Sequence, residues 1–115
     1  MSTNKPKILI VDDEPDILEL IEYNLKKEGY QVYTASNGQE AVQEARKTLP
    51  DLIILDIMMP KMDGIEACRI MRAMPEFKNT FMVFLTARSE EYSEIAGFNV
   101  GADGVGGYFK DVVNP

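Results

Sequence analysis

Residues that could carry chemistry stand where the apolar runs of this sequence end. Asp12 and Asp13 follow the run KILIV, Asp56 follows LIIL, Thr86 follows FMVFL, and Lys110 follows the last short apolar stretch. Carboxylates, a hydroxyl and an ammonium group are the components of a magnesium-dependent phosphoryl-transfer site. Whether these side chains meet depends on the elements that carry them.

The run LIILDI, which contains Asp56, is typical of a strand buried on both faces of a parallel sheet. An unpaired carboxylate inside such a strand would be very costly, so we expect Asp56 at its carboxyl end. Open α/β sheets place their ligands at that edge. Pro60 and the pair Asp63-Gly64 indicate a turn directly after the acid.

The other elements alternate between strands and helices along the chain. Helix boundaries are predicted from Pro15 and Gly29 for the first helix, and from a capping box of Ser36 and Gln39 for the second. We expect the second helix to bury Ala41, Val42, Ala45 and Leu49. Strands are expected at residues 7–11, 31–35, 52–57, 81–85 and 105–109, and helices at 15–28, 36–49, 63–74 and 89–100.

Strand–helix alternation with right-handed crossovers predicts a doubly wound, five-stranded parallel sheet, the α/β class. The carboxyl ends of parallel strands share one edge, so the acids, Thr86 and Lys110 should converge there. Two carboxylates 4 Å apart repel by about 4 kcal/mol at an effective dielectric near 20, and protonation or a cation would offset this. The chain has no histidine, and hard oxygen ligands favour Mg²⁺. Asp56 would then be the nucleophile and form an acyl phosphate.

Composition sets the wider limits. The 115 residues fit one domain over residues 1–115, with residues 1–6 frayed, and the net charge of −7 argues against direct nucleic-acid binding. Cys68 is the only cysteine, so no internal disulfide forms and a reducing compartment is favoured; its spacing fits a helix core. No run is long enough to span a membrane, and no signal peptide is visible. We expect a soluble cytoplasmic domain.

Four segments, KILIVDDEPDIL, PDLIILDIMMPKMDG, FLTAR and GAD, resemble the receiver domain of two-component response regulators, the CheY-like (flavodoxin-like) fold. The resemblance runs from Lys5 to about Asp103. The loop MMPKMDG and the helix EPDILELIEYNL are most similar to receivers of OmpR/PhoB-type winged-helix transcription factors. The resemblance to receiver domains implies the strand order 2-1-3-4-5 known for CheY. It also implies a phosphoacceptor signalling domain and not an enzyme, beyond Mg²⁺-dependent self-phosphorylation from phosphodonors and autodephosphorylation.

The resemblance also implies roles for individual residues. Asp56 would accept a phosphoryl group from a sensor histidine kinase. Asp13, Asp56 and the Met58 backbone carbonyl would bind Mg²⁺, and Asp12 would act through water. Phosphorylation would reshape the surface of the helix at 89–100 and the last strand, and so regulate an output domain or partner in transcription control. The groups implied to bind the phosphoryl group or to switch with it are Thr86, the Ala87 backbone N–H, Lys110 and Tyr108.

The carboxyl end, residues 104–115, departs from the family pattern. Lys110 lies nine residues after Gly101, where the family spacing is seven, and Asp111 follows it where the family has proline. The position three residues before the lysine, which is usually aromatic, is Gly107. A fifth helix would be missing, leaving one face of the sheet under-covered. We therefore expect a homodimer or segment exchange through that face, an unstable monomer, or a truncated chain.

Other interpretations stay open. Asp13 could be no more than the cap of the first helix, Thr86 could be an ordinary strand-end hydroxyl, and Lys110 could be a surface residue. A magnesium phosphatase that also uses an aspartyl phosphate is an alternative, although its second acid would fall at Met58. A receiver-like interaction module without phosphorylation is another. A dinucleotide site is excluded because no glycine-rich loop follows the first strand.

Overall fold

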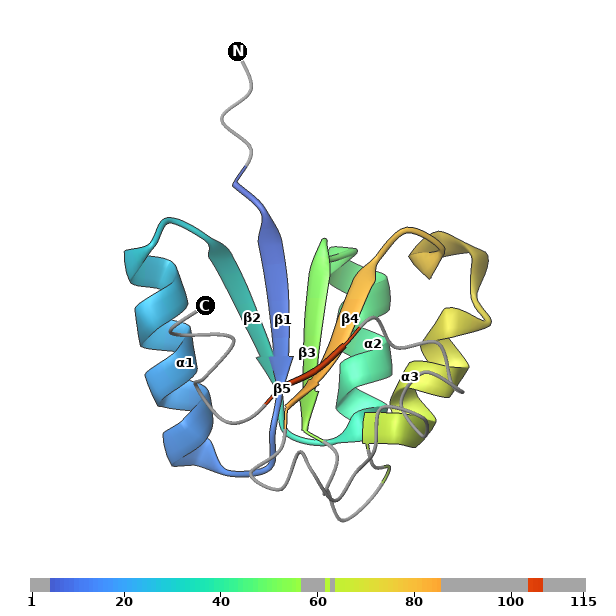
Figure 1. Cartoon of the computed structure of the whole chain (residues 1–115), viewed down its shortest axis with the longest axis horizontal. Coiled ribbons are helices and arrows are strands. Elements are labelled where there is room, and N and C mark those ends of the chain that lie inside the picture. Colours follow the sequence, from blue (N-terminus) through green and yellow to red (C-terminus); the bar gives the residue numbers. More distant parts are fainter. Residues whose placement is uncertain (1–4, 57–61, 63, 86–103, 107–115) are drawn as a thin grey trace.

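Five parallel strands form one sheet in the order β2-β1-β3-β4-β5 (Figure 1). The computed structural model describes residues 5–56, 62, 64–85 and 104–106 of the chain. This order confirms the predicted doubly wound sheet and its 2-1-3-4-5 arrangement. The strands are β1 (Lys7–Val11), β2 (Gln31–Ala35), β3 (Leu52–Asp56), β4 (Phe81–Leu85) and β5 (Gly104–Gly106).

Helices cover both faces of the sheet. The helix α1 (Pro15–Lys27) lies on one face, and α2 (Gly38–Thr48) and α3 (Gly64–Arg72) lie on the other (Figure 1). A short 3₁₀ helix, η1 (Pro75–Phe77), follows α3. None of the described helices is long and apolar enough to cross a membrane.

Two cores follow from the alternation of side chains along each strand. On β1, Ile8 and Ile10 pack toward α1, whereas Leu9 and Val11 pack toward α2 and α3. Apart from Lys7 at the start of β1 and Asp56 at the end of β3, these two central strands are therefore apolar on both faces, as the sequence runs predict. The core between the sheet, α2 and α3, here called the α2–α3 core, is the larger of the two.

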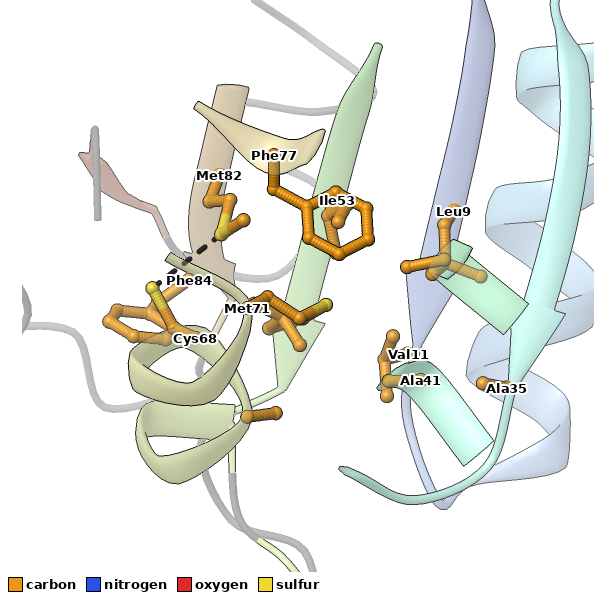
Figure 2. Close-up of a cluster of buried hydrophobic side chains, with 13 residues drawn as sticks. Leu9, Val11, Ala35, Ala41, Ile53, Cys68, Met71, Phe77, Met82 and Phe84 are labelled. Carbon is orange, nitrogen blue, oxygen red and sulfur yellow. Dashed lines mark hydrogen bonds between the residues drawn. The ribbon is translucent and has the colours of Figure 1, made fainter. Parts of the chain in front are cut away.

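Aromatic and sulfur-containing side chains pack among the aliphatic residues of the α2–α3 core. Phe77 of η1 lies beside Ile53 of β3, and Met71 of α3 lies beneath it (Figure 2). Cys68 is fully buried, and its Sγ lies 3.7 Å from Sδ of Met82. The cysteine therefore packs as a small core residue, in agreement with its helical spacing.

The start of α2 differs from the prediction by one residue. The N-cap is Asn37, whose Oδ1 accepts the backbone N–H of Glu40 at 2.9 Å. The Glu40 carboxylate reaches back and accepts the Ser36 backbone N–H at 3.0 Å. The predicted pair of Ser36 and Gln39 was wrong because asparagine caps a helix as well as serine does, and Glu40 is the carboxylate three residues after Asn37.

The end of α2 also corrects the prediction that Leu49 lies on the buried face. Leu49 is the C-cap, has φ +50°, and leaves 53% of its surface exposed. Pro50 follows directly, and proline disfavours the right-handed helical conformation in the residue before it. The left-handed cap therefore turns Leu49 out of the helical pattern that Ala41 and Ala45 follow.

Two further boundaries shift. The helix α3 ends at Arg72, and Pro75 begins η1, whereas the prediction placed the helix end directly before Pro75. The strand β5 begins at Gly104, one residue before the predicted start. Several predictions concern residues outside the described ranges. They are the helix at 89–100, the rest of the last strand, the Asp63 capping box, the missing fifth helix, and residues 1–4 of the start (1–6) that was predicted to be frayed.

Candidate functional site

Three carboxylates meet at the carboxyl edge of the sheet. Ligand oxygens of Asp12, Asp13 and Asp56 all lie within 4.8 Å of one another. The strand register produces this convergence: Val11 pairs with Leu55, so Asp12, directly after β1, and Asp56, the last residue of β3, lie at the same level. The site lies between β1 and β3, where the strand order reverses, which is where doubly wound sheets bind ligands.

Asp12 is held rigidly at the base of this cluster. Its backbone N–H donates to the Ala35 carbonyl at 3.1 Å, and its Oδ1 accepts the Glu14 N–H at 2.8 Å. The side chain is fully buried, and its Oδ2 has no hydrogen-bond partner among the residues that the structure describes. A buried carboxylate oxygen without a partner is costly, so it indicates a site that a cation or a proton would stabilise.

Burial raises the pKa of Asp12 above its ordinary value of 3.8, the Glu14 backbone N–H lowers it, and the negative charge of Asp13 raises it again. Folded protein without a metal therefore binds this proton more tightly than unfolded protein does. The free energy of unfolding of the metal-free protein therefore falls as the pH rises from 3.8 through the raised pKa of Asp12, and this loss of stability is complete above that pKa.

Replacing Asp12 with asparagine is expected to stabilise the metal-free protein. The amide removes the buried charge and can donate toward the neighbouring carboxylates, which should add about 1 to 2 kcal/mol and raise the melting temperature by about 4 °C or more. Thermal melts at pH 7 in EDTA measure this. Asp16→Asn, which removes an exposed acid from the first turn of α1, should give no such rise. A lower melting temperature for Asp12→Asn would contradict the prediction.

Asp56 and Asp13 complete the cluster from different environments. Asp56 ends β3 and leaves only 2% of its surface exposed, whereas Asp13 is exposed at the rim, two residues before α1 begins. The donor set consists of carboxylate oxygens, with one buried oxygen of Asp12 left unpartnered by the described residues. These groups fit Mg²⁺, a hard cation that takes few protein ligands and keeps several waters.

The structure brings together three of the predicted site residues. The other predicted groups lie outside the described residues and stay predictions. They are the Met58 carbonyl, Thr86, the Ala87 N–H, Tyr108 and Lys110.

The fold and the acidic cluster define a doubly wound α/β domain with a cation-type site at the reversal of strand order. The sequence matches the response regulator receiver domain over residues 8–105, and the chain belongs to this family. Receiver domains are signalling domains that bind Mg²⁺ at an acidic site; those of response regulators interact with histidine kinases and signal by phosphorylation. The prediction of the family is therefore confirmed.

Known proteins support this assignment. The alkaline phosphatase synthesis transcriptional regulatory protein PhoP of Bacillus subtilis is 49% identical over 98 residues, which cover 84% of this chain and 40% of that protein. The chain thus spans about two fifths of this relative. The chemotaxis protein CheY4 of Vibrio cholerae superposes with a TM-score of 0.84 at 36% identity, covering 88% of this chain and 84% of that one.

A second similar structure was solved with a metal. It is the receiver domain of the sensor histidine kinase PA1611 from Pseudomonas aeruginosa, with a magnesium ion coordinated in its active site cleft. It superposes with a TM-score of 0.82 at 28% identity and covers 90% of this chain and 84% of that one.

Proposed function

We propose that this domain accepts a phosphoryl group from a sensor histidine kinase on Asp56, with Mg²⁺ held beside it. The observation that carries the proposal is the cluster of three carboxylates within 4.8 Å, in which Asp56 ends a buried strand. Asp13, Asp56 and the Met58 carbonyl would bind the ion, and Asp12 would act through its water shell. The similar PA1611 structure, with magnesium in its cleft, supports this ligand chemistry.

The chemistry proposed for Asp56 is a nucleophilic displacement at phosphorus. A carboxylate oxygen of Asp56 forms the new P–O bond while the bond from phosphorus to the donor breaks, and the donor leaves with the electron pair of that bond. Asp12 and Asp13 would hold the cation beside Asp56, and its positive charge would favour the ionised, nucleophilic form of that carboxylate. When bound, Mg²⁺ would neutralise the carboxylate and phosphoryl oxygens. Water can later hydrolyse the acyl phosphate, which would reset the domain.

The signal proposed to leave the site is a change of surface. The groups proposed to bind the phosphoryl oxygens, or to move when these arrive, are Thr86, the Ala87 N–H, Lys110 and Tyr108. The surface formed by residues 89–100 and the last strand would then be reshaped and would regulate an output domain or partner. The relative PhoP is named a transcriptional regulatory protein. This supports the proposal that the receiver domain controls an output domain that acts in transcription.

Self-association through the α1 face of the sheet belongs to the same proposal. Phe81 opens β4, two residues before Val83, which packs toward α1, so both side chains lie on this face. Phe81 leaves 54% of its surface exposed there. Single exposed aromatic residues are common on monomers, so Phe81 only marks where a second copy of the chain would pack in this proposal.

The proposal is tested by incubating the protein with acetyl phosphate and Mg²⁺ and measuring its intact mass. We expect the addition of one phosphoryl group, with acetate as the leaving group. EDTA should prevent it, because the carboxylates would then repel the incoming anion. If the protein remained unmodified with Mg²⁺ present, or gained the same mass in EDTA, the proposed function would be wrong.

A further inference from the structure

Gly38, the first residue of α2, is in unusually close contact with Met62. A Cβ added to Gly38 would lie 2.6 Å from Cβ and 2.7 Å from Cγ of Met62, and closer still to the Met62 carbonyl oxygen. Real Cβ atoms essentially never make contacts below 3.0 Å. Gly38 is buried, and its φ lies outside the positive range, so its backbone does not require glycine. The absence of a side chain at residue 38 is therefore a matter of space.

This contact joins the two chain connections that leave the site. On one side, Gly38 follows β2, whose last residue, Ala35, accepts the Asp12 backbone N–H at 3.1 Å. On the other side, Met62 lies between Asp56, at the end of β3, and Gly64, at the start of α3. The Met62 side chain packs against the α2–α3 core, which holds it in place.

The first turn of α2 is connected to Asp12 through hydrogen bonds and the short stretch of chain after β2. The Asn37 cap binds Glu40, and the Glu40 carboxylate binds Ser36, so the turn and the residue after Ala35 are linked by hydrogen bonds. A side chain at position 38 would have to push this unit or Met62 aside. Either movement would disturb the support of one carboxylate of the cluster.

We propose that Gly38 is a positioning residue for the acidic site, acting by seating Met62 against the first turn of α2. This inference rests on the proposed function and identifies what fixes the spacing of the Mg²⁺ ligands. Magnesium demands near-ideal octahedral geometry, and functional groups must be held to within roughly 0.5 Å, so a small shift of either support should weaken binding.

Gly38→Ala and Gly29→Ala form a matched pair of test variants. Gly29 has φ +99° with nothing within 4 Å of an added Cβ, and it follows α1, away from the carboxyl edge of the sheet. Alanine at 29 is therefore strained by its backbone, whereas alanine at 38 meets the Met62 main chain. Magnesium titrations followed by calorimetry, at a temperature where both variants are folded, should give about tenfold weaker binding for Gly38→Ala. Gly29→Ala should stay within about twofold of the parent, since it leaves the site alone.

A second readout needs no metal. Amide hydrogen exchange of Asp12 in EDTA reports on the bond to Ala35, and we expect it to be faster in Gly38→Ala than the loss of global stability explains. In Gly29→Ala the exchange should follow global stability. If the parent bound no Mg²⁺, the proposed function would fail, and this exchange comparison would still decide the role of Gly38.

Met62→Ala covers the case in which Gly38→Ala does not fold. It keeps Gly38 but removes the side chain that holds Met62 in the core, so Mg²⁺ binding should weaken by about threefold or more. Unchanged Mg²⁺ affinity in folded Gly38→Ala would overturn the inference. Where that variant is unfolded, unchanged affinity in Met62→Ala would do so. Weakened binding in Gly38→Ala, or in Met62→Ala when Gly38→Ala is unfolded, supports it, provided that Gly29→Ala binds like the parent.

Discussion

Asp56→Asn is expected to abolish phosphorylation by acetyl phosphate. The amide carries no negative charge and is a poor nucleophile, while its shape keeps the end of β3 packed. Asp56 is 2% exposed and lies in the cluster with Asp12 and Asp13. It is the acid of this described cluster that ends a buried strand and faces a pair of acids from another strand. Intact-mass measurement in Mg²⁺ should show only unmodified protein.

Asp51→Asn is the matched control because Asp51 lies just before the same strand, at its opposite end. Its exposed carboxylate accepts the Lys7 backbone N–H at 2.8 Å, and an asparagine oxygen can accept the same bond. This variant should take up the phosphoryl group as the parent does. Phosphorylation of Asp56→Asn to the parent's level would show that another residue is the acceptor.

The convergence of the acids could be predicted from the sequence because it depends on topology. Apolar runs without alternation indicate buried parallel strands, and parallel strands deliver their carboxyl ends to one edge. Asp12 and Asp56 follow directly from that argument, without any knowledge of side-chain conformations. The order of the strands came from the resemblance to receivers, since alternation of strands and helices alone fits several orders.

The details that the sequence did not reveal depend on local competition and on space. Both Ser36 and Asn37 can cap a helix, and the carboxylate of Glu40 decides between them. Leu49 fits the helical pattern, but the proline after it disfavours a further right-handed helical residue, and Leu49 forms a left-handed cap instead.

Gly38 gave no signal as a functional residue. Its importance comes from contact with Met62, which is 24 positions away in the sequence. A glycine that opens a helix next to an asparagine cap looks like an ordinary boundary residue in one sequence. Only the three-dimensional approach of the two connections distinguishes a glycine needed for space from one needed for backbone conformation, such as Gly29.

Asp13→Ala is expected to weaken Mg²⁺ binding by about 10- to 100-fold. Asp13 contributes one of the three carboxylate oxygens that lie within 4.8 Å, and its exposed position at the rim means that its loss should disturb the core little. The chain has no tryptophan, so calorimetry or NMR titration is the appropriate measurement.

Asp16→Ala separates coordination from long-range charge. Asp16 is exposed in the first turn of α1, three residues from Asp13, and its removal changes the net charge by the same amount. Long-range attraction between exposed charges is screened over about 8 Å at physiological ionic strength, so Asp16 should contribute little to Mg²⁺ affinity. A large loss for Asp13→Ala beside a small loss for Asp16→Ala would identify Asp13 as a ligand. Equal small losses would mean that the exposed acids only attract the ion, and that the buried pair of Asp12 and Asp56 binds it.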